Sequence, residues 1–161
     1  MADRALFRGR GLQAIDAKFR VAIPAGLRAT IDANSGERIL LLSRHPVDPC
    51  LIGYDRAWSD QLQAELDRDE EKALAAGQSV DTFNIARRAF GAVEDIPFDS
   101  SGRFILPSYA RSKAKLADLA VFIGVGKTFE IWSPKVLLEA PGVDDDTKEM
   151  VAFDLAERGA A

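Results

Sequence analysis

The chain has 161 residues, of which 47% are hydrophobic and 29% charged, so it can bury one core without disulfides or metals. No apolar run is as long as a membrane span, no leader is recognisable at the N-terminus, and the single cysteine excludes an internal disulfide. These features predict a cytoplasmic protein without a membrane partner, and the net charge of −4 provides no general attraction for DNA.

Charge is unevenly distributed along the chain. Residues 1–30 carry six basic and two acidic groups, whereas residues 60–72 carry two basic and six acidic groups. Six further acidic groups follow residue 143. The basic N-terminal region can therefore contact phosphates even though the chain as a whole is acidic.

The N-terminal part of the chain predicts a turn, a strand and a short helix. Residues 7–15 lead into Asp16–Pro24, which has the pattern of a polar turn, a short apolar strand and a proline at the first position of a helix. Leu27 and Ile31 lie four residues apart and predict that helix. The cluster Asn34–Gly36 is typical of its end.

Two strands and two connecting helices are expected next. Residues 39–43 and 50–54 predict the strands, and Asp55 and Asp81 are suitable N-terminal caps for the helices. The apolar positions are Trp58, Leu62 and Leu66 in the first helix, and Phe83, Ile85, Ala86, Ala89 and Phe90 in the second. The helix pair is expected to connect two similar halves of the chain.

The second half repeats the first. Asp99–Pro107 has the plan of Asp16–Pro24, 83 positions later, and each proline is followed four residues on by an arginine, Arg28 or Arg111. A fold built twice from one plan is therefore expected.

The end of the chain predicts a hairpin, a helix and a tail. Residues 121–125 and 129–132 predict strands joined by a tight turn, and Ser133 and Pro134 are a helix cap and a first helical residue. From Asp144 onwards we expect an acidic tail with weak helical character.

The paired turns have two interpretations. In one, Arg20 and Arg103 contact phosphates and bases from the mouth of a turn. In the other, the arginines only pair at the surface with Asp16 and Asp99, which accept backbone N–H groups to close the turns. The repetition favours binding, with the two aspartates and Gly102 as structural members.

No catalytic residue, metal site or cofactor is predicted. His45 lies in a loop and Cys50 in an apolar strand, and one residue of each type excludes a zinc finger. The segment Gly124–Thr128 lacks the early glycine of a phosphate-binding loop, so a hairpin explains it better. Asp144–Asp146 lacks the spacing and glycine of a calcium loop.

The chain resembles the MraZ family of bacterial transcriptional regulators, which contain two SpoVT-AbrB-type domains. The resemblance extends over roughly residues 4–138. It rests on Phe7–Gly9, Asp16–Arg28, Ala86–Phe90, Asp99–Pro107, Gly124–Gly126 and Phe129–Trp132.

The resemblance implies an α+β fold of two swapped-hairpin, AbrB-like pseudo-repeats, interlocked into one small β-barrel-like core with flanking helices. The expected parts are repeat 1 (10–57), a helical connector (58–87), repeat 2 (88–132), and a C-terminal helix with an acidic tail (133–161).

The resemblance also implies a ring homo-oligomer that binds double-stranded DNA. Its targets would be repeated promoter sites of the division and cell-wall gene cluster, and it would be associated with the nucleoid. The Asp-x-x-x-Arg segments point to Arg20 and Arg103, and charge and spacing add Lys18, Arg28, Arg111, Arg8 and Arg10. The alternative is a protein-interaction or scaffold module without DNA binding.

One residue departs from the family pattern. Phe19 stands where the family turn usually has glycine, and a bulky residue adopts positive φ only at a cost. The first turn is therefore expected to be differently shaped or strained, and Arg103 to be better defined than Arg20.

Overall fold

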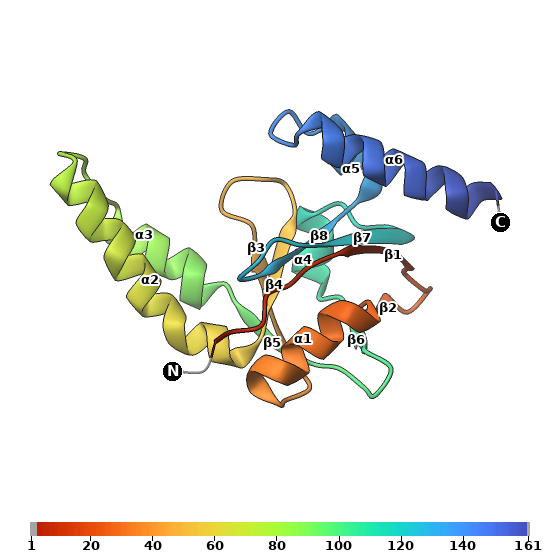
Figure 1. Cartoon of the computed structure of the whole chain (residues 1–161), viewed down its shortest axis with the longest axis horizontal. Coiled ribbons are helices and arrows are strands. Elements are labelled where there is room, and N and C mark those ends of the chain that lie inside the picture. Colours follow the sequence, from red (N-terminus) through yellow and green to blue (C-terminus); the bar gives the residue numbers. More distant parts are fainter. Residues whose placement is uncertain (1–2, 161) are drawn as a thin grey trace.

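A computed structural model describes residues 3–160, so residue 161 of the expected tail lies outside the described residues. The described part is an α+β fold (Figure 1). Its strands are β1 (Arg10–Ala14), β2 (Arg20–Ala22), β3 (Ile39–Arg44), β4 (Leu51–Tyr54), β5 (Glu94–Pro97), β6 (Arg103–Ile105), β7 (Leu119–Gly124) and β8 (Phe129–Trp132). Its helices are α1 (Ala25–Ser35), α2 (Arg56–Ala75), α3 (Thr82–Ala86), α4 (Ser108–Lys113), α5 (Pro134–Glu139) and α6 (Asp145–Ala160), with a π-helical segment at Arg87–Gly91.

Six strands form one antiparallel sheet in the order β1-β7-β8-β4-β3-β5, and β2 and β6 form a separate two-stranded ribbon. The sheet is open, because β1 and β5 are its two edges. The expected barrel-like core is therefore corrected to an open sheet with the ribbon packed beside it. Among the described residues, β2 and β6 pair only with each other, so no hydrogen-bonded ladder joins β1 to β5.

The strands of the two halves pair with each other. The first strand of the N-terminal half, β1, pairs with β7, and the first strand of the C-terminal half, β5, pairs with β3. In the ribbon, β2 pairs with β6. Each half therefore contributes strands to a sheet that neither half could complete alone.

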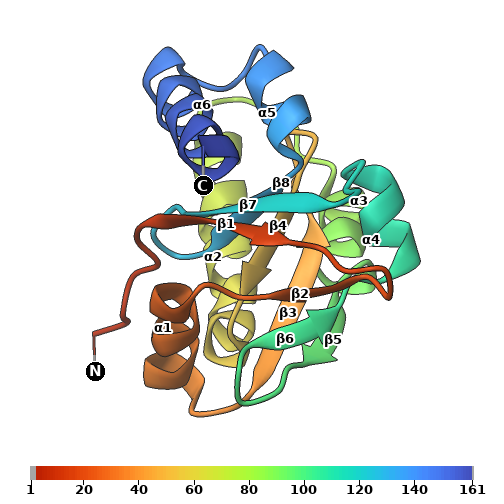
Figure 2. The ribbon, with the colours of Figure 1, turned by 90° about the vertical axis from the view of Figure 1, so that its right-hand side faces the viewer.

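The sheet is covered on both faces. One face packs against the ribbon, α1 and α4 through a core that contains Leu42, Phe104, Phe122 and Phe129. On the other face, one cluster joins Tyr54 to α2 and another joins β7 and β8 to α5 and α6. The ribbon consequently lies on the outside of the molecule, where Figure 2 shows it from the front.

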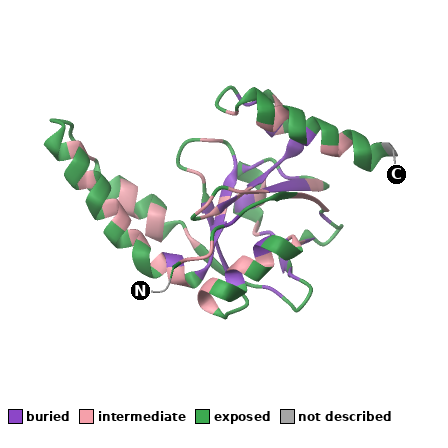
Figure 3. Cartoon of the chain, in the orientation of Figure 1, coloured by how far each residue is buried: buried purple, intermediate pink, exposed green. Residues whose placement is uncertain are grey.

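Helices α2 and α3 form an arm that projects away from the sheet and is largely exposed along its length (Figures 1 and 3). The expected connector is thus helical, but the apolar side expected for its second helix is not buried. Phe83 is 75% exposed and Phe90 is only partly buried, because the arm extends past the sheet and has little to pack against.

The helix starts are close to those expected. The carboxylates of Asp55 and Asp81 accept hydrogen bonds from the N–H groups of Trp58 and Asn84, which confirms both caps. Ser133 caps α5 with Pro134 at its first position, also as predicted. Pro24 and Pro107 are N-caps rather than first helical residues, since both have extended backbones with ψ of 142° and 144°.

The acidic tail is a regular helix, α6, which corrects the expectation of weak helical character. Asp144 accepts a hydrogen bond from the Thr147 N–H at 3.0 Å, as an N-terminal cap does. Val151 is fully buried against α5 and β7, and Asp154 forms an ion pair with Arg10 on β1. These tertiary contacts stabilise a helix that the local sequence pattern does not predict.

Candidate nucleic-acid interface

The outer face of the β2–β6 ribbon carries two arginines. The register places Arg20 opposite Ile105 and Arg103 opposite Ala22, and residues that pair in this way lie on the same face. The intervening pair, Val21 and Phe104, is buried on the other face. Arg20 and Arg103 are therefore diagonal neighbours, and the Cα atoms of such neighbours are expected about 7–8 Å apart.

Each arginine is held by its own turn, and the two turns have the same hydrogen bonds. In the first, Asp16 Oδ1 accepts from the N–H groups of Lys18 (2.8 Å) and Arg20 (2.9 Å). In the second, Asp99 Oδ1 accepts from the N–H groups of Ser101 and Arg103, both at 2.9 Å. The other carboxylate oxygen accepts from the arginine Nε, at 2.8 Å in the first turn and 2.9 Å in the second.

The backbone conformations also agree. Phe19 has φ 63° and Gly102 has φ 82°, so both residues lie in the left-handed region. Of the two outcomes expected for the first turn, the structure shows the strained one: the first turn keeps the shape of the second turn with a residue that disfavours positive φ. Arg103 was expected to be held in a better-defined position than Arg20. That difference is not seen, because the same hydrogen bonds anchor both arginines.

The turns fix the aspartates in their charged form. Hydrogen bonds from the backbone and side chain of Arg20 hold the pKa of Asp16 below its ordinary value. For Asp99, the backbone N–H of Arg103 is the main cause of the lowered pKa, and the guanidinium adds to it. The carboxylates therefore orient the Nε edge of each guanidinium at neutral pH.

The other edge of each guanidinium remains available. The side chains of Arg20 and Arg103 are 46% and 57% exposed, and their terminal nitrogens have no hydrogen-bond partner among residues 3–160. An arginine oriented by a carboxylate through Nε can still donate two parallel hydrogen bonds to a phosphate or a guanine.

The two turns are also joined across the ribbon. The Ile23 N–H donates to the Gly102 carbonyl, and the Leu106 N–H donates to the Phe19 carbonyl, both at 2.9 Å. Figure 2 shows the turns at opposite ends of the ribbon, one beside α4 and one beside α1. The helix of each half thus supports the turn of the other half.

The remaining predicted basic residues lie in different settings. Lys18 and Arg8 are exposed, whereas the guanidinium of Arg10 is paired with Asp154 at 2.6 Å. Arg28 and Arg111 each contact the turn of the opposite half. The excess positive charge of the N-terminal region is consequently reduced by partners that are distant in the sequence.

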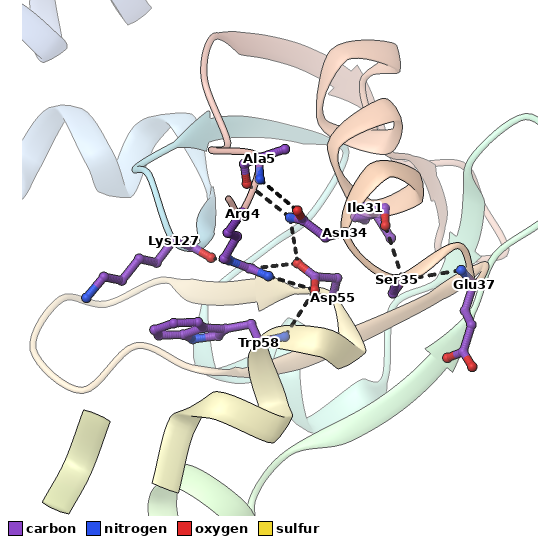
Figure 4. Close-up of polar contacts among 9 residues, drawn as sticks. All are labelled: Arg4, Ala5, Ile31, Asn34, Ser35, Glu37, Asp55, Trp58 and Lys127. Carbon is purple, nitrogen blue, oxygen red and sulfur yellow. Dashed lines mark hydrogen bonds and ion pairs between the residues drawn. The ribbon is translucent and has the colours of Figure 1, made fainter. Parts of the chain in front are cut away.

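Arg4 is another member of that basic region, but its side chain is only 13% exposed. Figure 4 shows it pointing toward Asp55. Its guanidinium donates to both oxygens of the fully buried Asp55 at 2.6 and 2.8 Å, and to the Lys127 carbonyl at 2.9 Å. Asn34 on α1 donates to the same carboxylate at 3.2 Å. This cluster joins the N-terminal segment, α1, α2 and the β7–β8 hairpin.

Ile105 is a surface residue that the expected site omitted. It is 61% exposed and lies on the outer face of the ribbon, directly opposite Arg20 and two residues from Arg103. The period of two along a strand places residues 103 and 105 on one face, so the signal was present in the sequence. An apolar group there can contact a thymine methyl in the major groove.

His45, Cys50 and Glu130 bring potential ligand atoms within 4.8 Å of one another. His45 Nδ1 accepts hydrogen bonds from two backbone N–H groups, at 2.9 and 3.0 Å, so the proton of the neutral ring is on Nε2. Nε2 faces Glu130 Oε2 at 3.2 Å. A metal would need the Nε2 lone pair, so the geometry favours a hydrogen bond between these two side chains.

Cys50 and Glu130 are consistent with that interpretation. Burial raises the pKa of the Cys50 thiol, which keeps it protonated. Burial opposes the ionisation of Glu130, but hydrogen bonds from His45 and Trp132 outweigh it and hold the pKa of Glu130 below its usual value. The group therefore fastens the loop between β3 and β4 to β8.

None of the helices in residues 3–160 combines the length and apolarity needed to cross a membrane.

Comparison with known proteins identifies the family. A family profile described as "MraZ protein, putative antitoxin-like" matches residues 89–136. The transcriptional regulator MraZ of Gluconacetobacter diazotrophicus is 33% identical over 136 residues, which cover 80% of this chain and 79% of the relative. The protein of that name from Roseiflexus sp. strain RS-1 is 31% identical over 152 residues, covering 94% of this chain and 98% of the relative. The chain therefore belongs to the MraZ family of transcriptional regulators.

Proposed function

We propose that the chain is a sequence-specific DNA-binding regulator and that the outer face of the β2–β6 ribbon contacts the DNA. The observation that carries this proposal is the position of Arg20 and Arg103. They lie on one exposed face, and each is oriented through Nε by the aspartate of its own turn. A transcriptional regulator has no need of a catalytic group.

A two-stranded ribbon fits the major groove of B-DNA, which is about 12 Å wide. The arginines would donate their terminal N–H groups to guanine edges or phosphates, and Ile105, opposite Arg20, would contact a thymine methyl. Because the aspartates already fix the guanidinium planes, little side-chain freedom is lost on binding.

The ribbon is proposed to be the joint between two swapped-hairpin pseudo-repeats, at 10–57 and 88–132, with a connector at 58–87 and the C-terminal part from 133. The pairing of β1 with β7 and of β5 with β3 supports this division. The two turns also have matching hydrogen bonds, which supports the same division.

The proposed targets are repeated promoter sites of the division and cell-wall gene cluster, bound at the nucleoid in the cytoplasm by a ring of several subunits. One ribbon offers few phosphate contacts, and the chain is negatively charged overall. Several ribbons on one rim would bind repeated sites by multivalency. The exposed apolar surface of the arm, which includes Phe83, supports contacts between subunits.

The test compares Arg20→Ala and Arg103→Ala with the wild type in gel-shift titrations. The probe is a double-stranded fragment from upstream of the gene cluster, with a shuffled fragment as competitor. Each variant should lose about 1–3 kcal/mol of binding free energy, because each removes one oriented arginine. Melting temperatures should change little.

Arg56→Ala is the matched control. Arg56 is also an exposed arginine paired with a carboxylate, Asp95, but it lies on α2 away from the ribbon, so its removal should leave DNA affinity unchanged. Wild-type affinity should fall steeply as salt rises. Absence of binding at low salt would instead support the alternative, a protein-interaction or scaffold module.

A further inference from the structure

The two turns have the same backbone conformation, but the residue with positive φ is Phe19 in the first turn and Gly102 in the second. A Cβ added to Gly102 would lie 2.5 Å from Arg28 Nη1 and 3.0 Å from the Ile23 carbonyl oxygen. The space above Gly102 is therefore already filled by the arginine of α1. In the first turn the equivalent space belongs to Phe19, whose side chain is 40% exposed.

This difference changes what the helix arginines do. Arg28 Nη1 donates to the Ser101 carbonyl at 2.7 Å and to the Ile23 carbonyl at 3.3 Å. Its guanidinium is thus bound to the backbone of the second turn and to that of Ile23, which lies between β2 and α1. Arg28 is a positioning residue that holds the second turn in shape.

Arg111 occupies the equivalent place in the other half but makes no such bonds. Its guanidinium carbon lies 3.3 Å from the centre of the Phe19 ring, so the two groups are in stacking contact. Among residues 3–160 its side chain has no hydrogen-bond acceptor and no ion-pair partner. Stacking uses the face of a guanidinium and leaves the N–H groups at its edge available.

We propose that Phe19 and Arg111 form a phosphate-binding site beside Arg20 that the second half of the molecule does not possess. Phe19 fixes the guanidinium plane of Arg111, and the edge of that plane binds a backbone phosphate of the DNA. A residue in a strained conformation at a functional surface is expected where it serves binding rather than stability. This inference rests on the proposed function of the ribbon.

The test is a matched pair of variants, Arg111→Ala and the control Arg56→Ala, assayed on the same DNA fragment over a series of salt concentrations. The slope of log affinity against log salt is negative, and each phosphate contact adds about 0.9 to its magnitude. Arg111→Ala should lower that magnitude by about 0.9 and weaken binding to specific and shuffled fragments alike. Arg56→Ala, which removes an exposed arginine of α2 away from the ribbon, should leave the slope unchanged.

The variant Phe19→Gly distinguishes an effect on DNA binding from an effect on stability. It restores the residue that suits positive φ, so the melting temperature should stay the same or rise, while the salt slope should fall as it does for Arg111→Ala. In the Arg111→Ala background, Phe19→Gly should have no further effect on the slope.

An unchanged slope in Arg111→Ala, with wild-type binding intact, would overturn the inference. Equal loss of slope in Arg56→Ala and Arg111→Ala would do the same. If the wild type itself does not bind the fragment, the proposed function is wrong, and the proposed phosphate site is then wrong as well.

Discussion

Asp55 has two roles, and only the first of them was predicted from the sequence. It caps α2 through the Trp58 N–H, and it is also the buried partner of Arg4 and Asn34. Removing one member of a buried ion pair leaves an uncompensated charge in the interior, which costs far more than the loss of an exposed pair. The carboxylate therefore contributes to the arrangement of four segments at once.

Arg4→Ala and Asp55→Ala should each lower the free energy of unfolding by about 3–5 kcal/mol, measured by urea denaturation. Arg56→Ala removes an exposed ion pair and should cost less than about 1 kcal/mol. Replacing both partners, as in Arg4→Met with Asp55→Leu, should be less harmful than either single alanine. Equal costs for the buried and the exposed pair would contradict the role assigned to Asp55.

At the scale of elements, the local patterns were good predictors and the distant partners were not. The caps at Asp55, Asp81 and Ser133 depend on hydrogen bonds within three residues, so they could be predicted. The ion pairs of Arg4 and Arg10 join residues far apart in the chain, and no short pattern indicates them. The stacking of Arg111 on Phe19 was missed for the same reason.

Helix α6 shows how tertiary contacts decide whether a segment forms a regular helix. Val151 is fully buried, whereas Phe153, two residues on, is exposed. Val151→Ala should lower the free energy of unfolding by about 2 kcal/mol for the two buried carbon groups removed. Phe153→Ala in the same helix should be nearly neutral. Chemical denaturation of both variants checks this, and equal effects would show that α6 does not dock as described.

At the scale of the whole molecule, the exposed apolar surface of the arm is unusual for a chain that acts alone. A groove at the base of the arm is lined by Trp58, Leu62, Leu66 and Ile85, and Phe83 on α3 is exposed. Such surfaces mark places where proteins associate.

Light scattering should give a mass several times 17.5 kDa. Phe83→Ser should lower that mass, because a polar side chain removes apolar area from the proposed contact, and Phe153→Ser on α6 serves as its control. A mass of one chain for the wild type at micromolar concentration would contradict the ring.

The pairing of β1 with β7 also has a consequence for how the chain is made. The partners are roughly 110 residues apart, and contacts at such separation form slowly. During synthesis β1 emerges first and has no neighbour until nearly the whole chain has left the ribosome. The nascent N-terminal half therefore presents unpaired strand edges, and it is in this interval that we expect chaperones or aggregation to compete with folding.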